Sequence, residues 1–254
     1  MIENNVISFS GGKDSTAMAL LMLEKGEPIH SVVAFDTGWE FPQMVDHWGE
    51  FEQKTGLEIV KLYPRKSFDY WLAEHRVISR VGENKGKLTR VGNGWPSSMR
   101  RWCTREKVDT IRKYLKNIEN PVSCVGFAAD EEHRMYGKKM NSSDHKYRYP
   151  LIEYGVDEKE ALAICKKYGF EWGGLYDHFR RVSCFCCPLQ RLSELRVLRR
   201  EFPDQWSVMM EMDKNIPDNI GFRMYDTVHD LDARFADEDR QIDMFNQNEI
   251  ITLT

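Results

Sequence analysis

The chain has 254 residues, of which 41% are hydrophobic and 12% aromatic, and its formal net charge at pH 7 is −4. This composition excludes an intrinsically disordered chain, and the length is enough for one domain with a full core plus a small appendage. No apolar run approaches the length of a membrane span, and residues 1–5 lack the features of a signal peptide. We therefore expect a cytoplasmic protein that makes no membrane contact.

Residues 6–16 predict a strand, a tight glycine turn and the start of a helix that runs to about residue 25. Such a junction aims backbone N–H groups and the positive end of the helix dipole at the turn, which suits an anion. Lys13 adds a positive charge, and Asp14 can hold Mg²⁺ or cap the helix. We interpret the turn as a phosphate site. The residues expected to bind the phosphates are Ser10, Gly11, Gly12, Lys13, Asp14 and Ser15.

The sequence Ser-Gly-Gly-Lys-Asp-Ser at residues 10–15 resembles the pyrophosphate loop of the N-type ATP pyrophosphatases. This superfamily includes GMP synthetase, tRNA-thiolating enzymes and the phosphoadenosine phosphosulfate (PAPS) reductases. The loop differs from GxxxxGK[ST], because Ile7 stands where that motif requires its first glycine. The resemblance implies that the chain binds ATP and Mg²⁺ and that Lys13 and Asp14 are catalytic. A glycine turn that only joins a strand to a helix is the alternative.

Further strands are expected at residues 29–35 and 57–63, and a helix that begins at Pro42 lies between them. Strands that alternate with helices of this length predict an α/β fold. Its parallel, Rossmann-like (HUP-type) sheet should carry helices on both faces. Because ligands bind at the carboxyl ends of such strands, residues 10–15 and 35–38 are expected at the same rim.

The second rim segment begins with Asp36-Thr37-Gly38 and continues to Phe41-Pro42. It resembles the DTG-x-x-FP stretch of PAPS reductase-like proteins, which lies against the adenosine. The resemblance implies that Phe35 and Thr37 flank the adenine and that Asp36 lies near the nucleotide. A polar strand end before a good helix start explains the same residues.

Residues 67–75 predict a short helix, and the residues from there to 96 predict a long mobile loop in which glycines alternate with basic side chains. Long loops in compact domains are usually functional, so this one is a candidate to close over a nucleic-acid backbone or a second substrate. Residues 61–115 hold fourteen Lys and Arg against five Asp and Glu, whereas residues 201–254 hold four against thirteen. The basic middle favours an anionic partner. A flexible basic loop with solvated helix faces is the alternative.

Six cysteines in a cytosolic chain are better explained as metal ligands, reactive thiols or core residues than as disulfides. Cys103 lies near the start of a helix expected to end at residue 115, among arginines that lower the pKa of a thiol. It is therefore expected to be catalytic, as a nucleophile, or a metal ligand. Residues 184–187 place three cysteines in four positions, and Cys184 and Cys187 have the C-x-x-C spacing of a metal site. Cys124 and Cys165 lie in apolar patterns and are expected in the core.

Residues 101–104 and 183–188 resemble the two cluster-binding regions of PAPS reductase-like proteins, with Ser183 in place of a glycine. Adenosine phosphosulfate reductases have two adjacent cysteines where this chain has Trp102 and Cys103. The resemblance implies an iron–sulfur cluster of the four-iron type. Its expected ligands are Cys103, Cys184, Cys186 and Cys187. Zinc and free thiols are alternatives, and Cys186 is either a ligand or a sulfur-carrying thiol.

Residues 121–127 predict another strand, and the residues from Gly126 to Arg134 resemble the G-x-x-x-DE-x-x-R segment of the same superfamily. The resemblance implies that Gly126 faces the nucleotide, that Arg134 binds the α-phosphate, and that Asp130 or Glu131 holds Mg²⁺. Residues 149–152 resemble the family's extended Pro-Leu element. Helices are expected at about residues 157–168, 192–200 and 206–213.

Together these observations predict a PAPS reductase-like ATP-pyrophosphatase domain at residues 1–190 and a small helical extension at residues 191–254. The expected reaction cleaves ATP to AMP and pyrophosphate and adenylates a substrate for sulfur transfer. The resemblance favours the ATP-pyrophosphatase subunits of DNA phosphorothioation systems, with DNA preferred to tRNA as the acceptor and a cysteine desulfurase as the sulfur donor. The alternatives are a PAPS or adenosine phosphosulfate reductase, a tRNA-thiolation enzyme and a non-catalytic regulator. No cysteine follows Cys187, which disfavours the reductases.

Overall fold

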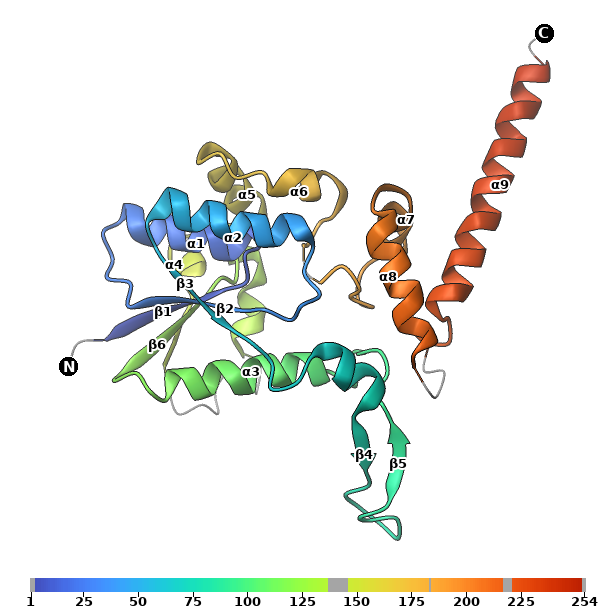
Figure 1. Cartoon of the computed structure of the whole chain (residues 1–254). Helices are drawn as coiled ribbons and strands as arrows, with labels where there is room; N and C mark the ends of the chain where they lie inside the picture. Colours follow the sequence, from blue (N-terminus) through green and yellow to red (C-terminus); the bar gives the residue numbers. More distant parts are fainter. Residues whose placement is uncertain (1–2, 137–145, 183, 217–220, 253–254) are drawn as a thin grey trace. The chain divides into compact units, whose positions relative to one another are not determined.

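The computed structural model describes residues 3–136, 146–182, 184–216 and 221–252, so Ser183 lies outside the described residues. The chain forms two compact units (Figure 1). The sheet unit contains Met1–Arg65 and Thr104–Cys184, and the hairpin–helix unit contains Lys66–Cys103 and Phe185–Thr254. A domain boundary near residue 190 stays a prediction.

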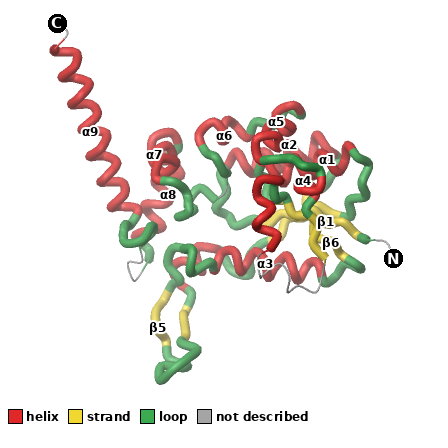
Figure 2. Tube along the Cα trace, turned by 180° about the vertical axis from the view of Figure 1, so that it is seen from behind, coloured by secondary structure: helices red, strands yellow, loops and turns green. Residues whose placement is uncertain are grey.

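The sheet unit is built on five parallel strands in the order β3-β2-β1-β6-β7. Figure 2 draws the strands in yellow, with β1 and β6 labelled. Their bounds are β1 Asn4–Phe9, β2 Ser31–Phe35, β3 Ile59–Leu62, β6 Pro121–Val125 and β7 Lys146–Arg148. In the central strand, Ile7 lies opposite Val32 on one side and Cys124 on the other. The predicted α/β class and parallel sheet are confirmed. The short polar strand β7 was not predicted, because Lys-Tyr-Arg offers no apolar alternation.

Helices cover both faces of this sheet, as the sequence predicts. α1 (Lys13–Glu24), α2 (Pro42–Thr55) and α5 (Glu158–Lys167) lie on one face, and α3 (Trp102–Leu115) lies on the other (Figure 1). The apolar side of α3 packs Leu115 against Val6 and Val33 of the sheet. The expected extended Pro-Leu element is wrong. Residues Pro150–Glu153 form helix α4, since proline is well suited to the first helical position.

An aromatic cluster under α1 and α2 surrounds a buried histidine. The ring of His47, which is 1% exposed, lies 4.5 Å from the Trp172 ring and 5.1 Å from the Phe170 ring. Its Nε2 lies 3.0 Å from Thr16 Oγ1. Burial, and to a smaller extent the charge of Lys54, lowers the pKa of His47 to about 3, so the imidazole is neutral in the folded protein.

Acid is therefore expected to destabilise the protein through His47. Because the folded-state pKa of about 3 is below the unfolded-state value, stability is complete above the unfolded pKa and is lost as the pH falls towards 3. Between about pH 8 and about pH 5 the expected loss is about 2 kcal/mol. Denaturant unfolding of the wild type and of His47→Gln at several pH values measures this loss. The free energy of unfolding of the variant should depend less steeply on pH. Parallel curves for the two proteins would contradict this assignment.

The hairpin–helix unit contains a separate two-stranded sheet and several helices. Its elements are the π-helical turn Tyr70–Glu74, β4 Arg76–Ile78, β5 Leu88–Val91, α7 Leu192–Glu201, α8 Pro203–Lys214 and α9 Val228–Thr252. The prediction of a long mobile loop up to residue 96 is wrong in part, because residues 76–91 form an antiparallel hairpin. A helix was expected in each of the regions where α7 and α8 lie. Among the described residues, no helix is both long and apolar enough to cross a membrane.

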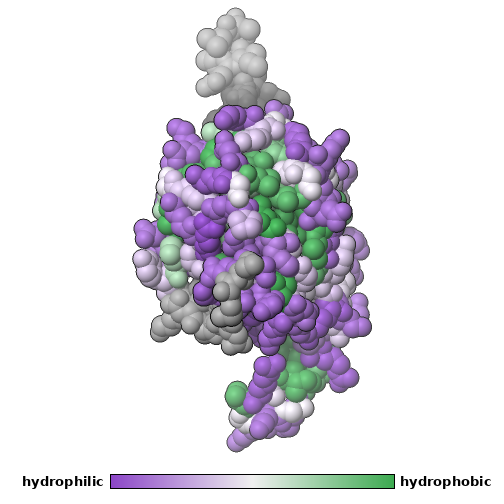
Figure 3. All heavy atoms as spheres, turned by 90° about the vertical axis from the view of Figure 1, so that its left-hand side faces the viewer, coloured by the Kyte–Doolittle hydropathy of each residue, from purple (hydrophilic) through white to green (hydrophobic). Residues whose placement is uncertain are grey.

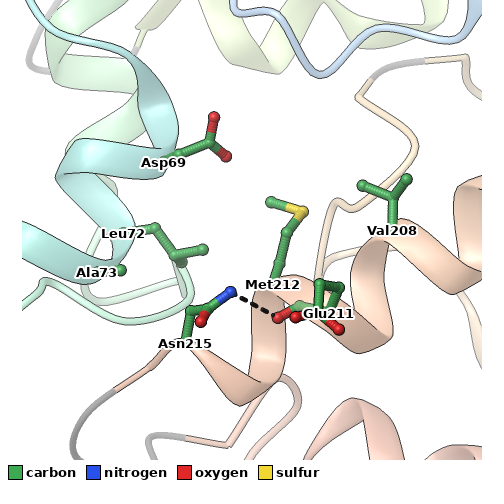
Figure 4. A pocket seen from close by; sticks show the side chains of 7 residues that line it. All are labelled: Asp69, Leu72, Ala73, Val208, Glu211, Met212 and Asn215. Atoms are coloured by element: carbon green, nitrogen blue, oxygen red, sulfur yellow. Dashed lines mark hydrogen bonds between the residues drawn. The ribbon is translucent and has the colours of Figure 1, made fainter.

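Polar anchors hold this unit together. The indole of Trp95 donates a hydrogen bond to Asp213 at 2.7 Å, and that of Trp206 donates one to Asp232 at 2.8 Å. A cavity of about 250 Å³ lies between the Tyr70–Glu74 turn and α8 (Figure 4). Leu72, Val208 and Met212 supply much of its apolar lining, with Glu211 beside them. None of its lining residues belongs to the sheet unit, where the predicted phosphate loop lies.

Candidate functional site

The predicted phosphate loop connects the central strand β1 to helix α1 at the carboxyl edge of the sheet. The Ser10 backbone N–H donates to Ser15 Oγ at 3.2 Å, and Ser15 Oγ donates to the carbonyl of Gly12 at 3.0 Å. The helix begins at Lys13 with Gly12 as its N-cap, and Gly12 has no side chain to cap it. Strand order changes direction next to this loop, since β2 and β6 flank β1 on opposite sides. Such switch points are where open α/β sheets bind ligands.

Glycine is required at two positions of the site. Gly11 has a φ of +78°, and a Cβ there would lie 2.3 Å from Trp48 Nε1 and 2.6 Å from Met44 Sδ. At Gly126, after β6, a Cβ would lie 3.0 Å from the backbone of Asp14 and Ser15. The two glycines thus let neighbouring segments approach the loop backbone closely.

Two aromatic residues that sequence reasoning missed brace the loop. Trp172 Nε1 donates to the Gly11 carbonyl at 2.7 Å, and the Lys13 backbone N–H donates to the Tyr176 hydroxyl at 2.7 Å. Burial, chiefly, raises the pKa of Tyr176, so its hydroxyl stays neutral. Neither residue lies in a recognisable motif, and both are about 160 positions from the loop in sequence. No local signal could have found them.

The charged end of the loop joins Lys13, Asp14 and the missed residue Glu158. Lys13 is only 5% exposed, and its Nζ lies 3.2 Å from Asp14 Oδ1 and 3.6 Å from Glu158 Oε2. Burial raises the pKa of Asp14, although Lys13 opposes this. Burial also acts to raise the pKa of Glu158, but the hydrogen bond from Arg181 and nearby cations lower it overall. The structure thus brings two of the three predicted catalytic residues, Lys13 and Asp14, together in a charged cluster at the start of α5. Cys103, the third, belongs to the hairpin–helix unit.

The predicted residues after β6 join the same charge network. Glu131 is 5% exposed and pairs with Arg134 at 2.5 Å and with Arg181. Arg181 in turn lies 3.1 Å from Glu158. The Arg134 guanidinium lies 4.1 Å from the centre of the Phe127 ring, which holds it at the end of the strand. This network connects Glu131 and Arg134 to Lys13 through Arg181 and Glu158.

The two remaining acidic candidates have different surroundings. Asp130 Oδ1 accepts the backbone N–H of Glu158 at 3.3 Å, so Asp130 helps to hold the start of α5. Asp14 Oδ1 is buried, and Lys13 Nζ lies 3.2 Å from it, outside the geometry of a hydrogen bond. That oxygen is the better fit to Mg²⁺, which binds carboxylate oxygens, provided that the Lys13 ammonium turns to a phosphate. The roles of Asp14, Asp130 and Glu131 as metal ligands stay predictions.

The loop after β2 is folded around Glu40. Thr37 Oγ1 donates to both carboxylate oxygens of Glu40 at 2.7 Å, and Asp36 accepts the Gly38 N–H at 2.8 Å. Burial, with a contribution from Asp36, raises the pKa of Glu40. Phe35, expected beside adenine, is 4% exposed at the end of β2.

Cys184 lies against this same loop. It forms an isolated antiparallel bridge with Glu40, and its Sγ is 3.5 Å from Thr37 Oγ1. The structure therefore brings one of the four predicted cluster ligands to the rim segment that was predicted to contact the nucleotide.

The other candidate thiols, Cys103, Cys186 and Cys187, belong to the hairpin–helix unit. Cys186 is 1% exposed, and Cys103 and Cys187 are half-buried. Within the described parts of the chain, no three His, Cys, Asp or Glu side chains are grouped as a metal site. Cys124 and Cys165 are fully buried, which confirms that they are core residues, and burial raises the pKa of the Cys124 thiol to about 12.

Comparisons with known proteins extend over most of the chain. The family model of the phosphoadenosine phosphosulfate reductase domain matches residues 4–190. Two uncharacterised proteins of Methanocaldococcus jannaschii are each 24% identical over 79% and 81% of this chain, and the chain spans 39% and 46% of their lengths. An uncharacterised 37.8 kDa protein of Escherichia phage 186 is 24% identical over 83% of this chain and 74% of its own length. A crystal structure from M. jannaschii, described as a predicted subunit of tRNA methyltransferase, aligns with 14% identity and a TM-score of 0.37 over 80% of this chain and 91% of that chain.

Proposed function

This chain belongs to the phosphoadenosine phosphosulfate reductase domain family, and from this premise we propose that it is an ATP pyrophosphatase. Family members are generally enzymes that act on adenine nucleotides. The proposed reaction cleaves ATP to AMP and pyrophosphate and leaves the AMP on an oxygen of the substrate. Sulfur then replaces that oxygen.

The observation that carries the proposal is the complete loop at residues 10–15, with Lys13 and Asp14 paired at the start of α1. A helix N-terminus with glycines in the preceding turn favours a phosphate group. Trp172 and Tyr176 fix the loop before any ligand arrives, so little of the binding energy is needed to order it. Arg134, whose side chain is 41% exposed, presents a guanidinium fork suited to bidentate contact with a phosphate.

The chemistry begins with an acceptor oxygen that attacks the α-phosphorus while the bond to the β-phosphate breaks and pyrophosphate leaves. Negative charge grows on the leaving pyrophosphate, and the ammonium of Lys13 is placed to stabilise it. Asp14, through its buried Oδ1, would hold Mg²⁺, which neutralises phosphate charge when it is bound. In the second step sulfide forms a bond to the adenylated centre, and AMP leaves with the former acceptor oxygen.

The residues proposed to hold the sulfur for the second step are Cys103, Cys184, Cys186 and Cys187. Four cysteine thiolates are the donor set of either a four-iron cluster or a zinc site. An iron–sulfur cluster held by these residues would supply thiolate- or sulfide-based sulfur chemistry. The contact of Cys184 with Thr37 supports a position for this chemistry beside the loop after β2.

The proposed acceptor is a nucleic acid, with DNA preferred to tRNA. The proposed sulfur donor is a cysteine desulfurase, together with a thiol reductant that releases its persulfide sulfur as sulfide. The excess of fourteen Lys and Arg over five Asp and Glu at residues 61–115 supports an anionic acceptor.

The test is to incubate the purified protein with ATP, Mg²⁺, DNA or tRNA and a desulfurase, and to measure AMP and pyrophosphate. Equal amounts of both are expected. Release of ADP and phosphate, or no turnover with any acceptor, would contradict the proposal. Sulfite release from PAPS or adenosine phosphosulfate without pyrophosphate formation would favour a reductase instead.

A further inference from the structure

The β4–β5 hairpin is a ribbon of two strands that is separate from the five-stranded sheet (Figure 1). An isolated hairpin is marginally stable in water, so it needs a support. Here the support is the Tyr70–Glu74 turn at its base. The Gly92 N–H donates to the His75 carbonyl at 2.8 Å, and the Gly94 N–H donates to the Leu72 carbonyl at 2.9 Å. A Cβ at Gly92 would lie 2.5 Å from that same Leu72 oxygen, which shows how closely the ribbon joins the turn.

The tip of the hairpin is held by its own hydrogen bonds. The Ser79 N–H donates to the Lys87 carbonyl at 3.0 Å, and the Gly86 N–H donates to the Ser79 carbonyl at 2.9 Å. The Lys85 N–H donates to the Gly82 carbonyl at 3.1 Å. The ribbon therefore presents a defined surface, and a partner would not have to order it first.

One face of the ribbon exposes apolar side chains. The pairs Arg76–Val91 and Ile78–Leu88 lie opposite each other across the strands. Ile78 is 42% exposed, Leu88 46% and Val91 37%, and Val81 at the tip is 77% exposed. Green atoms lie among purple ones at the lower end of the molecule in Figure 3. Apolar side chains that gather at an exposed surface with a polar rim mark an interaction site.

The same ribbon is strongly basic. Residues 76–91 contain five Lys and Arg and a single acidic residue, Glu83. Arg76, Arg80, Lys85 and Lys87 are exposed, and Arg90 is half-buried. The partner must therefore combine a high density of negative charge with apolar surface between the charges.

We infer that the β4–β5 hairpin enters the major groove of B-form duplex DNA. That groove is about 12 Å wide and admits a two-stranded β-ribbon, with phosphates on both rims and thymine methyl groups on its floor. The exposed cations of the hairpin would pair with the phosphates on the rims, and Ile78 and Leu88 would contact the thymine methyl groups on the floor. The major groove of A-form RNA is too deep and narrow for such a ribbon. This inference rests on the proposed function and deepens it, since it identifies the hairpin as the element that binds the DNA acceptor.

The experiment measures binding of the full chain to labelled duplex DNA, duplex RNA and single-stranded DNA of one sequence, at about 50 to 200 mM salt. The hairpin variant is Arg80→Gln/Lys85→Gln/Lys87→Gln. The matched control, Lys116→Gln/Lys166→Gln/Lys167→Gln, removes the same charge from exposed positions at the ends of α3 and α5. Each phosphate contact contributes about 0.9 to the slope of log affinity against log salt, so the hairpin variant should have a slope shallower by about 3.

The expected outcome is weaker duplex-DNA binding by the hairpin variant with an unchanged unfolding curve, near wild-type binding by the control, and weaker binding of duplex RNA by the wild type. A second variant, Ile78→Thr/Leu88→Thr, should weaken binding with little change in the salt slope. Identical behaviour of the two charge variants, or duplex RNA bound as tightly as DNA, would overturn the inference. Pyrophosphate release from ATP is scored separately, so failure of the proposed function and failure of the hairpin inference are distinguishable.

Discussion

Replacement of Lys13 by glutamine is expected to lower the rate of pyrophosphate formation by about 10²–10³-fold, since it removes a positive charge aimed at the leaving group. The side chain is 5% exposed and already held beside Asp14 and Glu158, so its position is fixed before ATP binds. The loss should be mainly in kcat, because the charge on the β-phosphate grows as the bond to the α-phosphate breaks. Steady-state pyrophosphate release at saturating ATP measures it.

Lys25→Gln is the matched control. Lys25 caps the opposite end of α1, where its Nζ lies 4.7 Å from the centre of the Tyr154 ring. This variant removes the same charge from the same helix and should keep wild-type activity. If Lys13→Gln kept full activity as well, the loop would not be the site of ATP cleavage.

Replacement of Gly11 by alanine is expected to destabilise the protein by about 3 kcal/mol and to abolish ATP binding. The left-handed φ of +78° is unfavourable for alanine by about 1 kcal/mol. The new Cβ would also lie 2.3 Å from Trp48 Nε1, and overpacking of this kind costs about 1–3 kcal/mol. Denaturant unfolding measures the loss of stability, and calorimetry measures ATP binding.

Gly38→Ala separates the two contributions. Gly38 has the same φ of +78°, but a Cβ there would have no described atom within 4 Å. This variant should lose only about 1 kcal/mol, because it carries the backbone strain without the clash. Equal losses of stability for Gly11→Ala and Gly38→Ala would show that the clash with Trp48 does not contribute.

Local sequence pattern was sufficient for the first part of the sheet unit, where β1, the glycine turn and α1 were all expected near their observed positions. Apolar runs bounded by Gly or Pro are strong signals, because burial and backbone geometry act on the same residues. The hairpin at residues 76–91 lacked this signal, since it exposes Ile78 and Leu88 and alternates them with cations. The Pro-Leu element was mistaken for an extended segment because Pro150 suits the first turn of a helix as well.

Sequence likewise predicted some residues of the candidate site and not others. Lys13, Asp14 and Gly126 lie in contiguous motifs, so the sequence alone could nominate them. Glu158 and Tyr176 lie about 150 positions downstream of the loop and contact it only in the folded chain. Contacts between residues so far apart produce no local sequence pattern. A metal centre formed by Cys103, Cys184, Cys186 and Cys187 also depends on contacts between distant parts of the chain, and it stays a prediction.

The charge network around Lys13 is largely compensated from within. Four cations, Lys13, Arg134, Arg180 and Arg181, are paired with three carboxylates, Asp14, Glu131 and Glu158. A fully ionised triphosphate would therefore meet an excess of only one positive charge and would have to displace internal counterions. ATP that arrives with its own metal ion avoids most of that competition. Nucleotide affinity should then vary little with ionic strength, in contrast to the steep salt dependence expected where an uncompensated basic surface meets a polyanion.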